Sequence, residues 1–302
     1  MLDPRIKLRH VSCFLEVARL RSVVKAAEVL GMTQPGVSKT LKELEQVLGV
    51  ALFDRSRRSL TLTRFGEVFL SHAGLGLAAL RQGVEALEQA RTDVAVVAIG
   101  VLPTVSAGLA PQAIKRFTQH RLFCRTRVVT GPSPYLLAQL RVGDLDFVVG
   151  RMANPDAMNG LSFEHLYSER IIPTVRPGHP LLATDLVDLR RIEAYPILMP
   201  PSGAIIRPAV ERLLLAYGIG RLHDEVETVS NSLGRAYTRA TDAIWMISEG
   251  VVATDIAEGQ LAGLPVDTSE TLGSIGITVR TGSVLSPQAE ALIRAVRETA
   301  AS

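Results

Sequence analysis

Residues 32–49 read MTQPGVSKTLKELEQVLG, and their spacing decides the first part of the fold. Apolar side chains recur three or four residues apart, which predicts an amphipathic α-helix with one buried face. These side chains are Val37, Leu41, Leu44 and Leu48. Thr33 is a favourable N-cap, Gly49 is a favourable C-cap, and Pro35 fits the first turn because its missing N–H has no helical partner there. The opposite face is polar, so the helix needs a polar partner.

Two shorter helices are predicted before this one. The first has a stripe at Val11, Phe14, Leu15 and Ala18. The second follows the N-cap Ser22, ends at Gly31, and has a stripe at Val23, Ala26, Ala27 and Leu30. Two helices, a tight glycine turn and a third helix form the order of a helix-turn-helix unit, whose last helix can enter the major groove of DNA. The residues expected to contact DNA from it are Gln34, Pro35, Gly36, Ser38, Lys39 and Lys42.

A small β-hairpin, or wing, is predicted next, because Leu60 and Leu62 alternate with threonines. Its basic tip carries Arg55, Arg57 and Arg58, which can contact phosphates or enter a minor groove. Residues 1–91 hold 14 lysines and arginines against 9 acidic residues, whereas the remainder holds 19 against 21. This imbalance favours a polyanion partner for the first part only; the alternative is an ordinary solvated surface.

A long amphipathic helix is predicted from residue 63 to about residue 91. Its apolar residues are separated by three or four positions, which favours pairing with a second copy of the chain. Packing onto the same chain is the alternative. The residues of this dimerisation stripe are Phe65, Phe69, Ala73, Leu77, Leu80, Val84 and Leu87.

The remaining residues alternate strand-like and helical segments, which predicts parallel sheets with crossover helices. Segments 94–103, 125–130 and 145–151 belong to one set, and segments 195–200, 225–230 and 243–248 belong to a second. Two α/β lobes would enclose a cleft at the carboxyl ends of their strands. We expect an α+β protein overall, with domains at 1–63, 64–91 and 92–302. Lobe I would comprise about 92–154 and 273–302, and lobe II about 160–264.

Composition limits the other possibilities. A chain of 302 residues can bury at least two cores. The beginning, MLDPRIKLRHVSCFLEV, does not resemble a signal peptide and no long apolar run occurs, so a cytoplasmic protein is expected. Cys13 and Cys124 stand alone, which predicts neither a disulfide nor a metal site. No cofactor is expected.

The first ninety residues resemble the winged helix-turn-helix of LysR-type transcriptional regulators. The resemblance rests on Ser22 to Leu30, Thr33 to Arg55 and Thr63 to Gly66. Segments 101–111, 139–151 and 163–169 are similar to the subgroup that regulates catabolism of protocatechuate and related aromatic acids; a sugar-responsive branch has similar segments. The resemblance implies a periplasmic-binding-protein-like effector domain and a tetramer. Pairing through the long helix predicts a dimer on a partly palindromic operator, and RNA polymerase is a further expected partner.

Two strand-to-helix junctions, at residues 104–106 and 202–204, are expected to face the cleft. Hydroxyls and free N–H groups at a positive helix end suit an organic carboxylate, although plain helix capping explains each hydroxyl as well. The resemblance implies effector contacts from Thr104, Ser106, Thr130, Ser202 and Gly203, to which we add Arg151 as a candidate charge partner. The chain departs from the family pattern at Glu249, which precedes a glycine.

An enzyme is not expected, because no nucleophile elbow, zinc-protease or phosphate-loop motif occurs and the six histidines are scattered. A solute-binding protein should carry an export signal and lack a basic winged unit, and this sequence has the reverse. A ligand-responsive regulator of transcription is therefore the favoured function.

Overall fold

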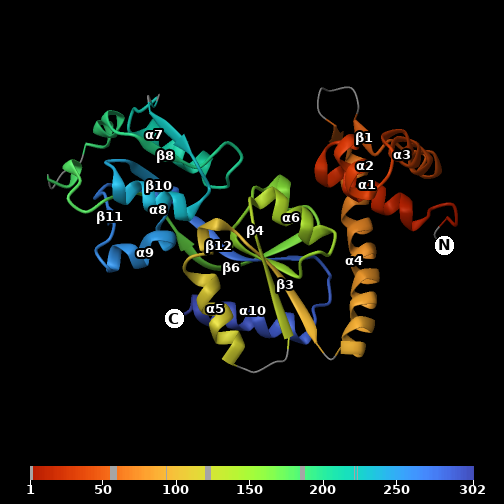
Figure 1. Cartoon of the computed structure of the whole chain (residues 1–302). Coiled ribbons are helices and arrows are strands. Elements are labelled where there is room, and N and C mark those ends of the chain that lie inside the picture. The colour runs from red at the N-terminus through yellow and green to blue at the C-terminus, as the bar shows by residue number, and fades with distance from the viewer. Residues whose placement is uncertain are drawn as a thin grey trace.

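A computed structural model of the chain describes residues 3–54, 60–92, 94–119, 124–183, 188–220, 222 and 224–302. Three parts follow one another along the chain: a small helical unit, one long helix and two α/β lobes (Figure 1). The predicted fold class is confirmed. We call residues 3–54 and 60–63 the winged unit and α4, Arg64–Thr92, the linker helix.

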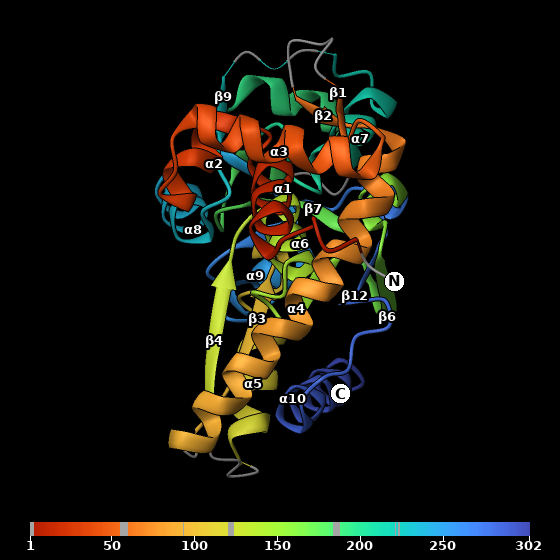
Figure 2. The same cartoon turned by 90° about the vertical axis from the view of Figure 1, so that its right-hand side faces the viewer.

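The winged unit packs α1 (Leu8–Leu20), α2 (Val23–Leu30) and α3 (Gln34–Leu48) around one apolar core. The predicted caps are present: the Ser22 hydroxyl accepts from Lys25 N–H, and the Thr33 hydroxyl accepts from Gly36 N–H. Gly31 and Gly49 end their helices in the left-handed conformation, at φ +62° and +70°. The wing pairs β1 (Phe53–Asp54) with β2 (Thr61–Leu62) in antiparallel register. Figure 2 shows α4 running away from this unit along lobe I.

Lobe I is built on a five-stranded sheet in the order β4-β3-β5-β12-β6. Its strands are β3 (Ala95–Val101), β4 (Cys124–Thr130), β5 (Phe147–Arg151), β6 (Leu161–Glu169) and β12 (Gly273–Arg280). β3 is parallel to β4 and β5, whereas β12 is antiparallel to β5 and β6. The helices are α5 (Leu109–Gln119), α6 (Ser133–Arg141) and α10 (Pro287–Ala300), with short 3₁₀ turns at Pro103–Val105 and Pro155–Met158.

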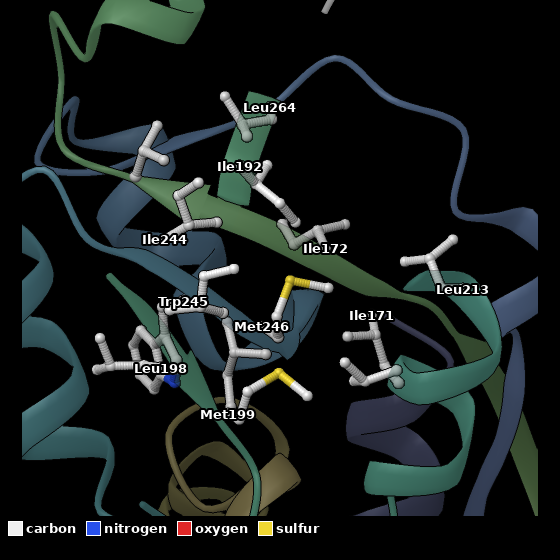
Figure 3. Close-up of a cluster of buried hydrophobic side chains, with 14 of the residues drawn as sticks. Ile171, Ile172, Ile192, Leu198, Met199, Leu213, Ile244, Trp245, Met246 and Leu264 are labelled. Carbon is white, nitrogen blue, oxygen red and sulfur yellow. The ribbon is translucent and has the colours of Figure 1, made fainter. Parts of the chain in front are cut away.

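Lobe II has the sheet order β11-β7-β10-β8-β9. Its strands are β7 (Ile171–Val175), β8 (Ile197–Met199), β9 (Glu225–Glu227), β10 (Ile244–Ser248) and β11 (Ala262–Gly263). The helices are α7 (Arg207–Ala216), α8 (Asn231–Ala240) and α9 (Glu249–Ala257), with 3₁₀ turns at Pro180–Ala183, Leu189–Ala194 and, beyond the lobe, Ser269–Thr271. Figure 3 shows its core, in which Trp245 and Met246 of β10 lie beside Leu198 and Met199 of β8.

The sheet topology corrects the expected start of lobe II at residue 160. β6 pairs with β12 along its whole length, so residues 161–169 belong to lobe I. The sequence interpretation missed this because antiparallel pairing to a strand more than a hundred residues later leaves no local signal. The chain therefore crosses between lobes just after Glu169 and again before Gly273. No helix among the described residues is long and apolar enough to cross a membrane.

Candidate functional sites

The polar face of α3 is open to solvent. Gln34, Pro35, Lys39 and Lys42 are exposed, and Gly36 and Ser38 are half-buried. The opposite face is anchored, because Val37, Leu41 and Leu44 are buried in the winged-unit core. The Glu45 carboxylate accepts from the N–H groups of Leu52 and Phe53, at 2.8 and 3.2 Å, which ties the base of the wing to this helix. The helix thus presents four of the six predicted contact residues to solvent, and the other two are partly accessible.

The predicted basic tip of the wing, Arg55, Arg57 and Arg58, lies outside the described residues. The base of the wing is described and is tightly held. Thr63 N–H donates to the Leu52 carbonyl at 2.9 Å, and its hydroxyl donates to the Ala51 carbonyl at 2.7 Å. These hydrogen bonds therefore fix the direction in which α4 starts from the hairpin.

The predicted dimerisation stripe of α4 is divided between two environments. Ala73 and Leu77 are buried and Phe69 is half-buried against α1, so this middle part packs onto the same chain. The remaining members are exposed by 57% or more of their side chains; they are Phe65, Leu80, Val84 and Leu87. The middle part of the stripe therefore follows the alternative of packing onto the same chain, and pairing with a second copy stays a prediction for the exposed members.

A pocket lies between the two lobes. Lobe I contributes Leu102, Pro103, Thr104, Pro132 and Ser133. Lobe II contributes Pro200, Ala204, Ile205, Ile206, Thr228, Val229, Asn231, Trp245, Met246 and Ile247. It encloses about 520 Å³, part of it open to solvent. Four of the described lining residues carry a hydroxyl or an amide, and none carries a charge. This composition suits an organic molecule with a large apolar surface.

Two polar side chains of the pocket differ in their hydrogen bonding. Thr104 is 5% exposed, and its hydroxyl has no hydrogen-bond partner among the described residues. A buried hydroxyl without a partner is costly, so a ligand that bonds to it gains free energy. Asn231, the first residue of α8, donates across the cleft to the Pro103 carbonyl at 2.9 Å and to the Ser106 hydroxyl at 3.2 Å.

The other predicted effector residues are placed differently. Thr130 is exposed at the end of β4, and Ser202 and Gly203 form an exposed turn; none of them is among the described residues that line the pocket. The strand-to-helix junction expected at residues 202–204 is wrong in its position, because α7 begins only at Arg207. The sequence interpretation missed Ser133, Thr228 and Asn231. Asn231 follows a strand and begins a helix, the same signal that selected the two junctions considered.

Arg151 does not line the pocket, because its guanidinium is used at the crossing between lobes. It donates to the Thr271 carbonyl and, at 3.4 Å, to the Glu169 carbonyl. Gly273 allows this approach, since a Cβ there would collide with the guanidinium. Arg151 therefore joins the two crossing segments, and the structure does not support its predicted role as a charge partner in the cleft.

The same crossing contains a buried carboxyl group, Glu169. Its Oε1 accepts from Gly250 N–H at 2.6 Å, while Oε2 has no partner among the described residues. Burial raises the pKa of Glu169 to about 7, against the opposing effects of the Gly250 N–H and Arg151. Glu249, where the chain departs from the family pattern, accepts two hydrogen bonds of 2.9 Å from the Arg170 guanidinium.

Comparisons with known proteins identify the two parts. Residues 8–67 match the model of bacterial regulatory helix-turn-helix proteins of the lysR family, and residues 90–301 match the LysR substrate binding domain. The chain belongs to the LysR-type transcriptional regulators. It is 49% identical over 301 residues to the HTH-type transcriptional regulator PcaQ of Agrobacterium fabrum, which covers 99% of this chain and 97% of that protein.

Solved structures of LysR-type regulators share the fold. LysG from Corynebacterium glutamicum with bound effector Arg has a TM-score of 0.60 at 18% identity, covering 98% of each chain. CbnR complexed with its target DNA has a TM-score of 0.55 at 20% identity, covering 97% of this chain and 100% of that one. This LysR-type regulator thus combines a DNA-binding unit with an effector-binding domain, and it is not an enzyme.

Proposed function

We propose that this LysR-type regulator senses an aromatic or related carboxylate, such as protocatechuate, in the pocket between its lobes and thereby controls an operon for aromatic-acid catabolism. The pocket carries the proposal. An aromatic ring can pack against Ile205, Ile206 and Trp245, while hydroxyl and amide groups hold the polar substituents. The identity to PcaQ supports the same subgroup.

A carboxylate in this pocket would be held by neutral donors. The Thr104 hydroxyl is free to donate, and the Thr228 hydroxyl, which accepts from Ser230 N–H, lines the same pocket and can donate as well. Hydrogen bonds to an ionised acceptor are about twice as strong as neutral ones, so a few donors suffice. A sugar carries hydroxyls on every side and would leave many of them unpaired against this largely apolar lining.

On the DNA side, the N-terminal half of α3 would enter the major groove while the wing arginines contact the flanking backbone. Pairing of two chains through α4 would set two recognition helices about one DNA turn apart, hence a partly palindromic operator. An effector can change the spacing of the two recognition helices only if it binds two arrangements of the paired chains with different affinities.

Isothermal titration and thermal shift with protocatechuate, other hydroxybenzoates, their ring-cleavage products and galactose test the effector class. A cognate ligand at about 100 times its Kd should stabilise the protein by about 2.7 kcal/mol. Thr104→Val keeps the shape of the side chain and removes its hydroxyl, so we expect affinity to fall by about tenfold or more. Thr130→Val, outside the pocket, is the matched control. Binding of galactose but of no aromatic acid would refute the effector class.

A further inference from the structure

Helix α6 extends from the effector pocket to the linker helix. At its N-terminal end, Pro132 and Ser133 line the pocket. At its C-terminal end, the turn of residues 141–144 lies against α4. Nine helical residues span about 13 Å. Figure 1 shows α6 between lobe II and α4.

The contact between this turn and α4 depends on two glycines. A Cβ added at Gly74 of α4 would lie 2.5 Å from the Arg141 carbonyl oxygen. A Cβ added at Gly143 would lie 2.6 Å from the Ala78 Cβ, and Gly143 also has a φ of +82°. Only glycine permits so close an approach at both positions. The backbones of lobe I and the linker helix are therefore in direct contact.

Side chains reinforce the contact on both sides. Val142 is buried in the same apolar core as Ala73 and Leu77, so a lobe I residue completes the core of the winged unit. Arg81 of α4 donates to the Val142 carbonyl at 3.1 Å and forms an ion pair with Asp144. We therefore expect the 141–144 turn and α4 to move together.

Helix α6 is also held in place along its whole length. Leu136, Leu137 and Leu140 are buried in the core of lobe I together with Leu102, which itself lines the pocket. Arg280 of β12 donates to the Leu140 and Leu145 carbonyls at 2.7 and 2.6 Å. Packed interiors have low compressibility and transmit strain, so we expect a displacement at one end of α6 to reach the other end.

We propose that α6 couples the effector pocket to the linker helix of the same chain, with the close contact between the 141–144 turn and α4 as the point of transmission. This inference rests on the proposed function, since it names how the effector acts on DNA binding. A ligand that displaces Ser133 moves the turn and, through Gly74 and Arg81, the direction of α4. DNA binding that fixes the direction of α4 should in turn change the affinity of the pocket for the effector, because linkage between two sites is reciprocal.

Gly74→Ala in the full-length protein tests this coupling. The new methyl must push the Arg141 carbonyl away, yet alanine favours the helix, and the residue belongs to neither the pocket nor α3. Gly76→Ala is a matched control, because a Cβ there has nothing within 4 Å. Arg81→Met is a second variant that weakens the same contact without adding bulk.

Two measurements are made on these variants. In the first, affinity for a duplex selected by the wild-type protein is measured with and without protocatechuate. Allosteric effectors commonly change affinity by about 5- to 150-fold. Gly74→Ala and Arg81→Met should bring the ratio near one while each protein still binds protocatechuate, and Gly76→Ala should retain the wild-type ratio. A wild-type ratio in Gly74→Ala would overturn the coupling.

The second measurement needs no effector. Hydrogen exchange of the ligand-free protein should be faster in Gly74→Ala than in Gly76→Ala, at residues 142–144 and along α6 to its first turn. Unchanged exchange in α6 would overturn the coupling whatever ligand binds. If protocatechuate fails to bind the wild type while exchange in α6 responds as expected, the proposed effector class fails and the coupling stands.

Discussion

Gln34 is the first residue of α3, and its exposed amide can both donate and accept a hydrogen bond. That geometry suits an adenine edge. We expect Gln34→Ala to reduce discrimination between operator and unrelated DNA by about 1 to 3 kcal/mol, with little change in the salt dependence. Gel-shift titrations at several salt concentrations measure both quantities.

Lys42→Ala is the matched comparison, because Lys42 is exposed farther along the same helix. This substitution should weaken binding to all DNA sequences alike. It should also lower the slope of log affinity against log salt concentration by about one, as loss of a phosphate contact does. Uniform weakening by Gln34→Ala would show that Gln34 does not read bases.

Glu169 gives the protein a pH-dependent stability. Its pKa is raised from 4.5 to about 7 by burial, so the folded state binds a proton that the unfolded state has released between these values. Stability from this group is full below about pH 4.5 and is lost as pH rises through 7. Glu169→Gln mimics the neutral carboxyl, and its stability relative to wild type should rise by about 3 kcal/mol between pH 4.5 and pH 8.

Urea unfolding at both pH values measures this difference. Glu164→Gln is the control: hydrogen bonds from Arg297 lower the pKa of Glu164, so its contribution should not change over this window. A Glu169→Gln variant with the same pH dependence as wild type would contradict the assignment of the buried proton to Glu169.

At the scale of elements, the exposed half of the α4 stripe carries the dimerisation prediction. Leu80 and Val84 are each more than half exposed, and burying the exposed part of such side chains is worth about 1 to 2 kcal/mol apiece. Replacing both with glutamate should convert a dimer into a monomer in light scattering. Leu215→Glu, at a residue of α7 that is 65% exposed, should leave the mass unchanged. A monomeric wild type would refute the dimer.

The sequence predicted helices well where caps marked their ends. Ser22, Thr33 and Gly49 set boundaries through local hydrogen bonds and φ angles, so nearby residues were sufficient. The start of α7 was misplaced because Gly203, at φ +86°, belongs to a turn, whereas Pro208 marks the first helical turn. Proline was the better signal at that junction.

At the scale of the whole molecule, the lining of the pocket between the lobes could be predicted only in part. The sequence points to Thr104 because a hydroxyl follows a strand of lobe I, but the places of Ser133, Thr228 and Asn231 depend on how the two lobes face each other. Arg151 was misjudged because its partners, the carbonyls of Glu169 and Thr271, come from crossing segments distant in sequence. Local patterns do not contain such pairings.

The place of β12 in lobe I determines when the sensor can form during synthesis. β12 (Gly273–Arg280) lies between β5 and β6, so the sheet of lobe I is incomplete until almost the whole chain has left the ribosome. The strands of lobe II all fall between Ile171 and Gly263, and the helices of the winged unit emerge first. A nascent or truncated chain that ends before residue 273 therefore carries the complete helix-turn-helix without a finished lobe I to form the pocket between the lobes.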